Sequence, residues 1–518
     1  MFLALTTDQP LVLSKREIHE IIKGFTDASD RAKKASFDGV EIHAGHGYLL
    51  NQFLSEKDNK RTDEYGGSLE NRARALIETL TAVKERCGKD FIVSYRLNGN
   101  DYIERGLEVE ETAKVAKMLE DTGVDLVHIS AGIFDSKGYP TVPYMNYPRG
   151  VFSEYAARIK KELARTPVVA VGRINTPEIA EKILQEGKAD LVAIGRGLIA
   201  DPYFIVKLKE GKRNLIRICM GCNTCLNRIL GMKSVACAIN PNVIASDEDF
   251  KNAKGKKKVL IIGSGPGGLE AARVSKLRGH YVLLIDKGDK IGGTMNLAKV
   301  APMKAEVENA IVFYKNILKE LSVEIRLNTE FSQEIISEFK PDVAILATGS
   351  VPFIPPIKGL NQTSYYVYDE VLKGKIPDGE KIAIVGGGMV GLEVAEYLSH
   401  LNKSITIIEM LQRIGMNVYA FVGKEVIPII EEDKNIKIYV NTKVEEIQDY
   451  KLIGVNKNGT IIKIKFDDLI ITMGAQPNCE IEQEVKNLVP EVFLIGDCKK
   501  IRKIFDAVEE GYKIALKI

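Results

Sequence analysis

The sequence has no apolar run of membrane-spanning length and almost no net charge. Without such a run we expect no transmembrane helix, and the formal net charge of +2 argues against nucleic acid or an anionic membrane as the main partner. The first residues lack the basic region of a signal peptide. The cysteines number seven and four are clustered, which indicates the reducing cytoplasm rather than a secreted disulfide framework. A length of 518 residues predicts two or three domains.

Four of the cysteines fall within nineteen residues, in the pattern C-x2-C-x2-C-x11-C. Thiolates at such short intervals can converge on one point without closing a long loop, so the segment predicts a metal site. Zinc ribbons usually present two C-x2-C pairs. Three cysteines in a tight run, a fourth further on and Pro241 shortly after it are more typical of a [4Fe–4S] cluster. The cluster is favoured over zinc, and the predicted ligands are Cys219, Cys222, Cys225 and Cys237.

Residues 14–211 alternate between helical and strand patterns, which predicts βαβ units and a parallel sheet. Ser14 and Glu17 have capping-box spacing at the start of the first helix. The predicted helices cover residues 14–35, 70–86, 110–122, 152–164 and 177–187. The predicted strands are Gly39–His43, Phe91–Arg96, Leu126–Ser130, Val168–Val171 and Leu191–Ile194.

A group of chemically active side chains stands at the end of the first predicted strand. His43, His46 and Tyr48 fall within six residues. Two imidazoles and a phenol close together can donate hydrogen bonds to a carbonyl and deliver a proton. Because α/β proteins place their chemistry just after the strands, these residues predict a catalytic site.

Two later strands each end in a glycine followed by an arginine, Gly172–Arg173 and Gly195–Arg196. Glycine lets backbone N–H groups approach an anion, and a short helix after it adds its positive end. The loops after the last strands of α/β barrels often bind phosphate. Two such pairs in successive loops therefore predict a phosphate site.

The C-terminal half carries two dinucleotide-binding fingerprints. In each, a G-x-G-x-x-G-like loop follows an apolar strand and opens a helix, and an acidic residue stands eighteen residues after the last glycine. The glycines make room for a pyrophosphate, and the acid accepts hydrogen bonds from ribose hydroxyls. The predicted residues are Gly263, Gly265, Gly268 and Asp286 for the first fingerprint and Gly386, Gly388, Gly391 and Glu409 for the second.

Two stretches around the histidines carry a family resemblance. The stretch from His43 to Ser55 and the stretch from Asn59 to Arg72 resemble the signature of the old yellow enzyme family of flavin reductases. With the four cysteines and the fingerprints, almost the whole chain resembles the long iron–sulfur members of that family. These are of the 2,4-dienoyl-CoA reductase, 2-enoate reductase and trimethylamine dehydrogenase type.

The resemblance implies an FMN at the mouth of a (β/α)8 barrel and gives the strand-end residues their roles. His43 and His46 would hold the carbonyl of the substrate, and Tyr48 would be the proton donor. The residues implied to contact FMN are Arg96 at the pyrimidine edge and Gly172, Gly195 and Arg196 at the phosphate.

The downstream half resembles the two-dinucleotide reductases related to glutathione reductase, in which one dinucleotide domain is nested within another. The first fingerprint, together with Gly496 and Asp497, would bind FAD. The second would bind NADH or NADPH, and Glu409 favours NADH because its charge repels a 2′-phosphate.

The resemblance therefore predicts a cytoplasmic NADH-dependent reductase of activated C=C bonds in enones, enoates or enoyl-CoA. Electrons would pass from NADH through FAD and [4Fe–4S] to FMN. Two features leave alternatives open. The cysteine spacing is closer to the amine dehydrogenase pattern, and residues 131–139 lack the histidine that dienoyl-CoA reductase places there. The alternatives are amine oxidation and a diaphorase that only passes electrons on.

The predicted fold class is α/β: a partial TIM-type barrel, an iron–sulfur segment and two nested Rossmann-like domains. The family signature normally sits on the fourth strand of an eight-stranded barrel, so only five strands are expected here. We expect an open partial barrel that binds FMN weakly or not at all. Either a separate chain supplies the missing units, or the sequence is a truncated product of a longer reading frame. A charged stretch at 245–257 reads as a linker. The predicted boundaries are 1–212 for the barrel, 213–245 for the cluster segment, 246–375 with 468–518 for the FAD domain, and 376–467 for the nicotinamide domain.

Overall fold

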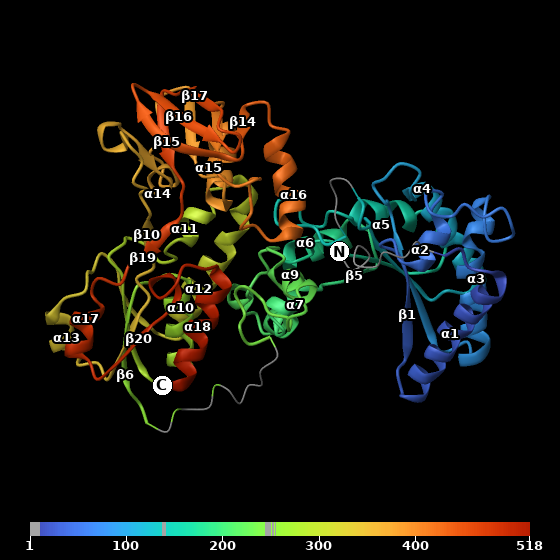
Figure 1. The fold of residues 1–518 in the computed structure, drawn as a ribbon. Coiled ribbons are helices and arrows are strands. Elements are labelled where there is room, and N and C mark those ends of the chain that lie inside the picture. The colour runs from blue at the N-terminus through green and yellow to red at the C-terminus, as the bar shows by residue number, and fades with distance from the viewer. Residues whose placement is uncertain (1–10, 137–140, 244–249, 251–252, 254) are drawn as a thin grey trace. The chain divides into compact units, whose positions relative to one another are not determined.

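The computed structural model describes residues 11–136, 141–243, 250, 253 and 255–518. Its backbone divides into two compact units (Figure 1). The first comprises Met1–Pro143 and Tyr147–Ile194, and the second comprises Tyr144–Asn146 and Gly195–Ile518. Every helix in the described ranges is too short or too polar to cross a membrane.

The first unit is built on a five-stranded parallel sheet in the order β1-β2-β3-β4-β5. Helices connect successive strands, so the predicted βαβ pattern and the partial barrel are confirmed. Among the described residues β1 and β5 each pair with one neighbour only. The strands are β1 (Gly39–Ala44), β2 (Ile92–Asn98), β3 (Leu126–Ser130), β4 (Val168–Ala170) and β5 (Leu191–Val192). The helices are α1 (Lys15–Lys34), α2 (Leu49–Leu54), α3 (Leu69–Cys87), α4 (Val109–Thr122), α5 (Ser153–Lys160) and α6 (Pro177–Gln185).

Local sequence explains where several of these helices begin and end. Ser14 and Glu17 form the predicted capping box, because each side chain accepts the backbone N–H of the other residue. Helix α5 ends earlier than predicted, at Lys160. The Glu120 carboxylate accepts the backbone N–H groups of residues 164–166 and so holds the chain there outside the helix. Strand β5 is also shorter than predicted, because only Leu191 and Val192 pair with β4.

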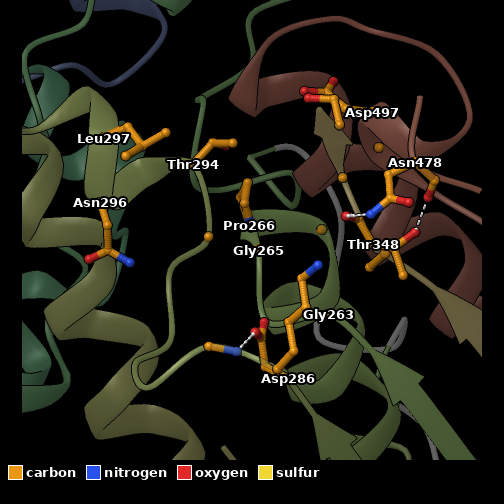
Figure 2. A pocket seen from close by; sticks show the side chains of 18 of the residues that line it. Gly263, Gly265, Pro266, Asp286, Thr294, Asn296, Leu297, Thr348, Asn478 and Asp497 are labelled. Atoms are coloured by element: carbon orange, nitrogen blue, oxygen red, sulfur yellow. Dashed lines mark hydrogen bonds between the residues drawn. The ribbon is translucent and has the colours of Figure 1, made fainter. Parts of the chain in front are cut away.

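The second unit contains two parallel dinucleotide-type sheets, one inserted into the other. The outer sheet has the order β20-β9-β6-β7-β8. Helices α10 (Pro266–Leu277), α12 (Glu308–Glu320) and α18 (Ile504–Lys517) belong to this fold, and the loop between β6 and α10 lines a cavity (Figure 2). Its strands are β6 (Lys258–Ile262), β7 (Tyr281–Ile285), β8 (Glu324–Arg326), β9 (Val343–Leu346) and β20 (Glu491–Leu494).

The inserted fold has a sheet in the order β11-β18-β12-β13-β14 and an antiparallel meander, β15-β16-β17. The chain enters it after β10 (Ser350–Pro352) and returns through β19 (Ala475–Pro477), and these two strands pair antiparallel. The predicted nesting is therefore confirmed. The sheet strands are β11 (Tyr366–Val367), β12 (Lys381–Val385), β13 (Ser404–Ile408), β14 (Ile436–Tyr439) and β18 (Asp468–Ile471). The meander strands are β15 (Thr442–Gln448), β16 (Lys451–Asn456) and β17 (Ile461–Lys465), and the main helices are α15 (Met389–Ser399) and α16 (Ala420–Glu431).

The four clustered cysteines lie in a segment with little regular structure. It contains α7 (Arg196–Ala200), α8 (Phe204–Lys209), a short 3-10 turn (Arg213–Leu215) and α9 (Thr224–Leu230). The linker expected at 245–257 falls largely outside the described residues.

Candidate functional site

The structure brings His43, His46 and Tyr48 together at the end of β1. The ring centroid of His43 lies 5.0 Å from that of His46 and 5.0 Å from that of Tyr48. His46 adopts a left-handed backbone with φ +60°, and its N–H donates to Asn98 Oδ1 at 3.1 Å. Tyr48 caps α2 and its side chain is exposed. The turn therefore presents the phenol to solvent beside two half-buried imidazoles.

The strand register places a row of basic side chains behind this turn. His43, Arg96 and His128 occupy matched positions on β1, β2 and β3. The His43 Nδ1, Arg96 Nε and His128 Nε2 atoms are buried and have no hydrogen-bond partner among the described residues. Buried polar atoms are nearly always paired. The row therefore offers unused hydrogen-bonding capacity where the resemblance implies a flavin.

Burial and nearby positive charge keep the two imidazoles of the turn uncharged. Burial and the charge of Arg96 together lower the pKa of His46 to about 3. Burial and Arg96 also lower the pKa of His43, while Glu41 opposes them. At neutral pH both rings are therefore neutral and can donate N–H hydrogen bonds without acting as strong acids.

Sequence reasoning missed His128 and two polar partners of these side chains, Ser130 and Glu41. Ser130 Oγ lies 2.7 Å from His46 Nε2 and accepts from Arg96 Nη2 at 3.4 Å. Glu41 Oε2 lies 3.0 Å from His128 Nδ1. A two-residue period along the predicted strands puts Glu41 on the face of His43, and Ser130 on that of His128. That period was the available signal.

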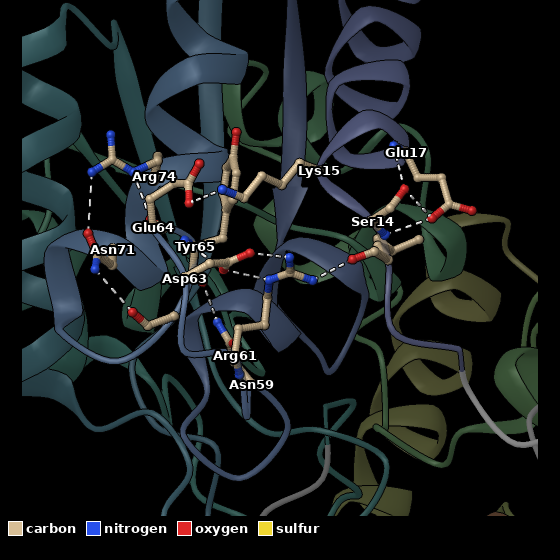
Figure 3. Close-up of polar contacts among 12 residues, drawn as sticks. Ser14, Lys15, Glu17, Asn59, Arg61, Asp63, Glu64, Tyr65, Asn71 and Arg74 are labelled. Atoms are coloured by element: carbon tan, nitrogen blue, oxygen red, sulfur yellow. Dashed lines mark hydrogen bonds and ion pairs between the residues drawn. The ribbon is translucent and has the colours of Figure 1, made fainter.

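The remaining polar residues of the family signature hold the loop after α2 (Figure 3). Arg61 donates to Asp63 and also to the backbone carbonyl of Leu13. Asn59 Nδ2 donates to the carbonyl oxygens of Phe53 and Tyr65, each at 2.7 Å. These contacts fix the loop that carries α2 and so support Tyr48 indirectly.

The residues predicted to bind phosphate belong to different structural units of the chain. Gly172 belongs to the first unit and has φ +113°, and a Cβ there would lie 2.6 Å from the Phe152 ring, so only glycine fits. Gly195 and Arg196 belong to the second unit. The Arg196 guanidinium donates to Asn223 Oδ1 in the cysteine segment. The phosphate site remains a prediction.

The four clustered cysteines lie in the second unit, and the structure forms no disulfide with any of the seven cysteines. The Gly221 N–H donates to Cys219 Sγ at 3.3 Å, and Cys222 Sγ lies 3.3 Å from Thr224 Oγ1. Among the described residues, no three His, Cys, Asp or Glu side chains are arranged to hold a single metal ion.

The electrostatics of the thiols fit a positively charged ligand. Burial raises the pKa of Cys225 to about 11, and Cys222 and Cys219 contribute while Arg196 opposes. Burial also raises the pKa of Cys237, again with Cys222 and Cys219 contributing. Thiols that hinder each other's ionisation in this way become good ligands when a metal centre compensates their charge. The donor set therefore fits an iron–sulfur cluster, which remains a prediction.

The first fingerprint lines a cavity of about 910 Å³ (Figure 2). Its lining residues include five that the sequence analysis assigned to FAD binding, which itself remains a prediction: Gly263, Gly265, Asp286, Gly496 and Asp497. Asp286 stands at the end of β7 and accepts the Ser264 N–H at 2.6 Å. A cavity of this volume, with a helix N-terminus and a carboxylate, suits a dinucleotide.

The second fingerprint lines a cavity of about 580 Å³, which includes Gly386, Gly388 and Glu409. The Glu409 carboxylate accepts the N–H groups of Gly387 at 2.7 Å and Leu411 at 2.8 Å, which fixes its orientation at the end of β13.

The last glycine of each fingerprint packs the helix against the strand. A Cβ at Gly268 would lie 2.0 Å from the carbonyl oxygen of Gly263, and one at Gly391 would lie 2.0 Å from that of Gly386. Neither position tolerates a side chain, which is the packing role expected of the third glycine.

A buried ion pair near the second fingerprint was also missed. Lys304, from the turn Pro302–Val307, pairs with Glu393 on α15, and both side chains are largely buried. Glu396, one turn further along α15, is buried beside them. Their separation in the sequence left no signal from which to predict the pair.

A barrel-type sheet with a histidine-tyrosine turn, joined to two nested dinucleotide folds, defines a flavin-linked oxidoreductase built from two modules. Residues 4–214 match the NADH:flavin oxidoreductase / NADH oxidase family, and residues 257–511 match the pyridine nucleotide-disulphide oxidoreductases. The chain belongs to the NADH:flavin oxidoreductase / NADH oxidase family, in the form fused to a pyridine nucleotide-disulphide oxidoreductase.

Relatives support this assignment along the whole chain. The chain is 38% identical to an NADH oxidase of Thermoanaerobacter brockii, over 98% of this chain and 79% of the relative. It is 36% identical to a cinnamate reductase of Clostridium sporogenes, over 98% of this chain and 78% of the relative. The solved complex of 2-naphthoyl-CoA reductase with 2-naphthoyl-CoA superposes with a TM-score of 0.94 at 33% identity, over 98% of this chain and 77% of that chain.

Proposed function

We propose that this oxidoreductase reduces activated C=C bonds at the expense of NADH. The observation that carries the proposal is the turn after β1, where two neutral imidazoles and an exposed phenol converge. Two relatives support the substrate class: one is named for reduction of cinnamate, and the other is a 2-naphthoyl-CoA reductase solved with its acyl-CoA.

Each side chain of the turn has a distinct role in this proposal. His43 and His46 donate N–H hydrogen bonds to the carbonyl oxygen of an unsaturated acid, ketone or thioester, which polarises the conjugated double bond. Tyr48 donates its phenolic proton to the α-carbon, because it is the exposed acid of the group. Arg96, half-buried in the row behind them, holds the flavin edge with its buried Nε, which has no partner among the described residues. When bound, the redox groups would carry electrons from NADH through FAD and [4Fe–4S] to FMN, which supplies the hydride.

The proposal includes the residues and boundaries predicted from the sequence. The dinucleotide cavities take FAD at the first fingerprint and NADH at the second, and the four cysteines hold the cluster. The proposed functional divisions are the barrel at residues 1–212, the cluster segment at 213–245, the FAD domain at 246–375 with 468–518, and the nicotinamide domain at 376–467. A chain with seven cysteines and no disulfide suits the reducing cytoplasm.

An anaerobic assay tests the reaction. NADH oxidation is measured with enones, cinnamate-type acids, aromatic or enoyl-CoA thioesters and, in the opposite direction, methylamines with an artificial acceptor. Reduction of an unsaturated carbonyl compound is the expected result. Oxidation of amines alone would replace the proposal with the amine dehydrogenase alternative, and NADH-dependent dye reduction alone would leave a diaphorase.

We also propose that the FMN site needs barrel strands beyond the five described here. A closed barrel of this type has eight strands, whereas β1 and β5 are edges of the described sheet. The units that would pair with these edges contribute to the FMN pocket in a closed barrel. The chain purified by itself is therefore expected to release FAD but little FMN. Stoichiometric FMN together with full enone reduction by the isolated chain would refute this part of the proposal.

A further inference from the structure

Among the described residues, one buried cation beside the cysteines forms no ion pair with a carboxylate. Arg217 stands two residues before Cys219 and its side chain is only 8% exposed. The guanidinium lies over the Phe313 ring, with its central carbon 4.5 Å from the ring centroid. Its Nη1 atom reaches the carbonyl oxygen of Ala200 only at 3.5 Å, and its Nε atom has no partner within the described ranges.

The carboxylates around Arg217 are committed to other cations. Asp201 forms an ion pair with Lys207 at 2.6 Å and accepts the backbone N–H, not the side chain, of Arg217. Glu270 is held by both guanidinium arms of Arg273. The positive charge of Arg217 is therefore in excess inside this part of the second unit.

An unpaired buried charge is destabilising by several kcal/mol unless a charge of opposite sign lies nearby. Asn240, three residues after Cys237, donates its backbone N–H to the Cys237 carbonyl oxygen at 3.4 Å. Its side-chain Nδ2 donates to the carbonyl oxygen of Ile199 at 3.0 Å, next to the Ala200 carbonyl that Arg217 reaches, so the Cys237 segment lies beside Arg217. A [4Fe–4S] cluster held by four thiolates is negatively charged in both of its oxidation states, and reduction adds one further negative charge. Such an occupant would compensate Arg217, and Arg217 would favour its reduced state.

We propose that Arg217 is the buried counter-charge of the cysteine site and that it raises the reduction potential of the cluster held there. This inference rests on the proposed cluster. The guanidinium acts at a fixed position through its charge: the cluster gains one electron, no proton moves, and Arg217 stays charged throughout.

The experiment uses the full chain purified anaerobically. Iron and sulfide are measured first, and the cluster midpoint potential is then determined by mediated titration followed by electron paramagnetic resonance. Arg217→Gln removes the charge and Arg217→Lys keeps it. The matched control is Arg228→Gln, because Arg228 belongs to α9 in the same segment and also stacks on a ring, that of Phe505 at 4.7 Å.

The expected result is at least a tenfold lower equilibrium constant for cluster reduction in Arg217→Gln, which is about 59 mV for one electron. The midpoint potential of Arg217→Lys should stay near that of the wild type, and the midpoint potential of Arg228→Gln should not change. An unchanged midpoint in an iron-replete Arg217→Gln protein would overturn the inference and leave the proposed function intact. Zinc or no metal in the wild type would overturn both.

If Arg217→Gln loses the cluster, the Arg217→Lys variant distinguishes between a role of the charge and a role of packing. If Arg217→Lys retains iron, the charge is required and the inference holds. If both variants lose iron while keeping the wild-type circular dichroism, Arg217 acts through packing on Phe313 and the inference is wrong.

Discussion

The buried carboxylate of Glu396 allows a quantitative test of the electrostatics inside the inserted dinucleotide-type fold. Its side chain is 4% exposed, and Oε2 has no hydrogen-bond partner among the described residues. Burial is the main cause that raises the pKa of Glu396 from 4.5 to about 7, and the charge of Glu393 also raises it. The Met303 N–H and the charge of Lys304 both lower the pKa. Burial raises the pKa of the Tyr144 phenol, and the charges of Cys222, Glu393 and Glu396 add to this shift.

The sign of the effect follows from the direction of the shift. A carboxyl group whose pKa is higher in the folded than in the unfolded protein contributes stability below pH 4.5, and this is lost as the pH rises through about 7. The two pKa values differ by an amount equivalent to at most about 3 kcal/mol. Because water and relaxation screen a buried charge, we expect about half of that. Glu396→Gln should therefore raise the free energy of unfolding by about 1.5 kcal/mol at pH 8 and by about a quarter of that at pH 5.

Urea denaturation at the two pH values measures this difference. The sequence has no tryptophan, so far-UV circular dichroism is the natural signal. Glu432→Gln is the matched control, since Glu432 is an exposed carboxylate that follows α16 in the same fold. The reasoning is refuted if Glu396→Gln changes the free energy of unfolding equally at both pH values.

Three further predictions concern the cofactors and the reaction. Anaerobically purified protein should contain about four irons and four sulfides per chain, and one zinc without sulfide would contradict the cluster. Tyr48→Phe should slow alkene reduction by roughly 10²–10⁴-fold while NADH still reduces the flavins in stopped-flow experiments; unchanged turnover would show that the proton comes from elsewhere. The wild type should have a higher kcat/KM with NADH than with NADPH, and Glu409→Gln should narrow the ratio. Equal kcat/KM values with NADH and NADPH in the wild type would show that Glu409 does not select NADH.

The dinucleotide folds could be predicted in detail because their signals are local. A strand, a glycine loop and a helix follow one another within about twenty residues, and the first and last glycines of each loop have a backbone or packing reason that the structure shows. Gly263 has φ +108° and Gly386 has φ +112°, in the region that favours glycine. The acids Asp286 and Glu409 end the next strand, as the spacing required.

The polar pairs around the sites could not be predicted in the same way. Lys304 and Glu393 are 89 residues apart, and Glu41 and His128 are 87 apart. Contacts of this kind depend on which strands are neighbours and on their register, which hydrophobic periodicity does not contain. The family resemblance supplied Arg96, His43 and His46, but it supplied neither His128 nor the serine and the carboxylate that contact this group.

The difference between residues fixed by strand register and residues on loops also concerns the choice of substrate. The row of His43, Arg96 and His128 is fixed by strand register and leaves little freedom for variation. The exposed ring of Phe134 lies 5.9 Å from the Tyr48 ring, on a loop closed by the hydrogen bond from the Ile133 N–H to Ser136 Oγ. A loop can change shape without disturbing a sheet. We therefore expect the difference between relatives named for NADH oxidation and for cinnamate reduction to lie in loops of this kind rather than in the row of strand residues.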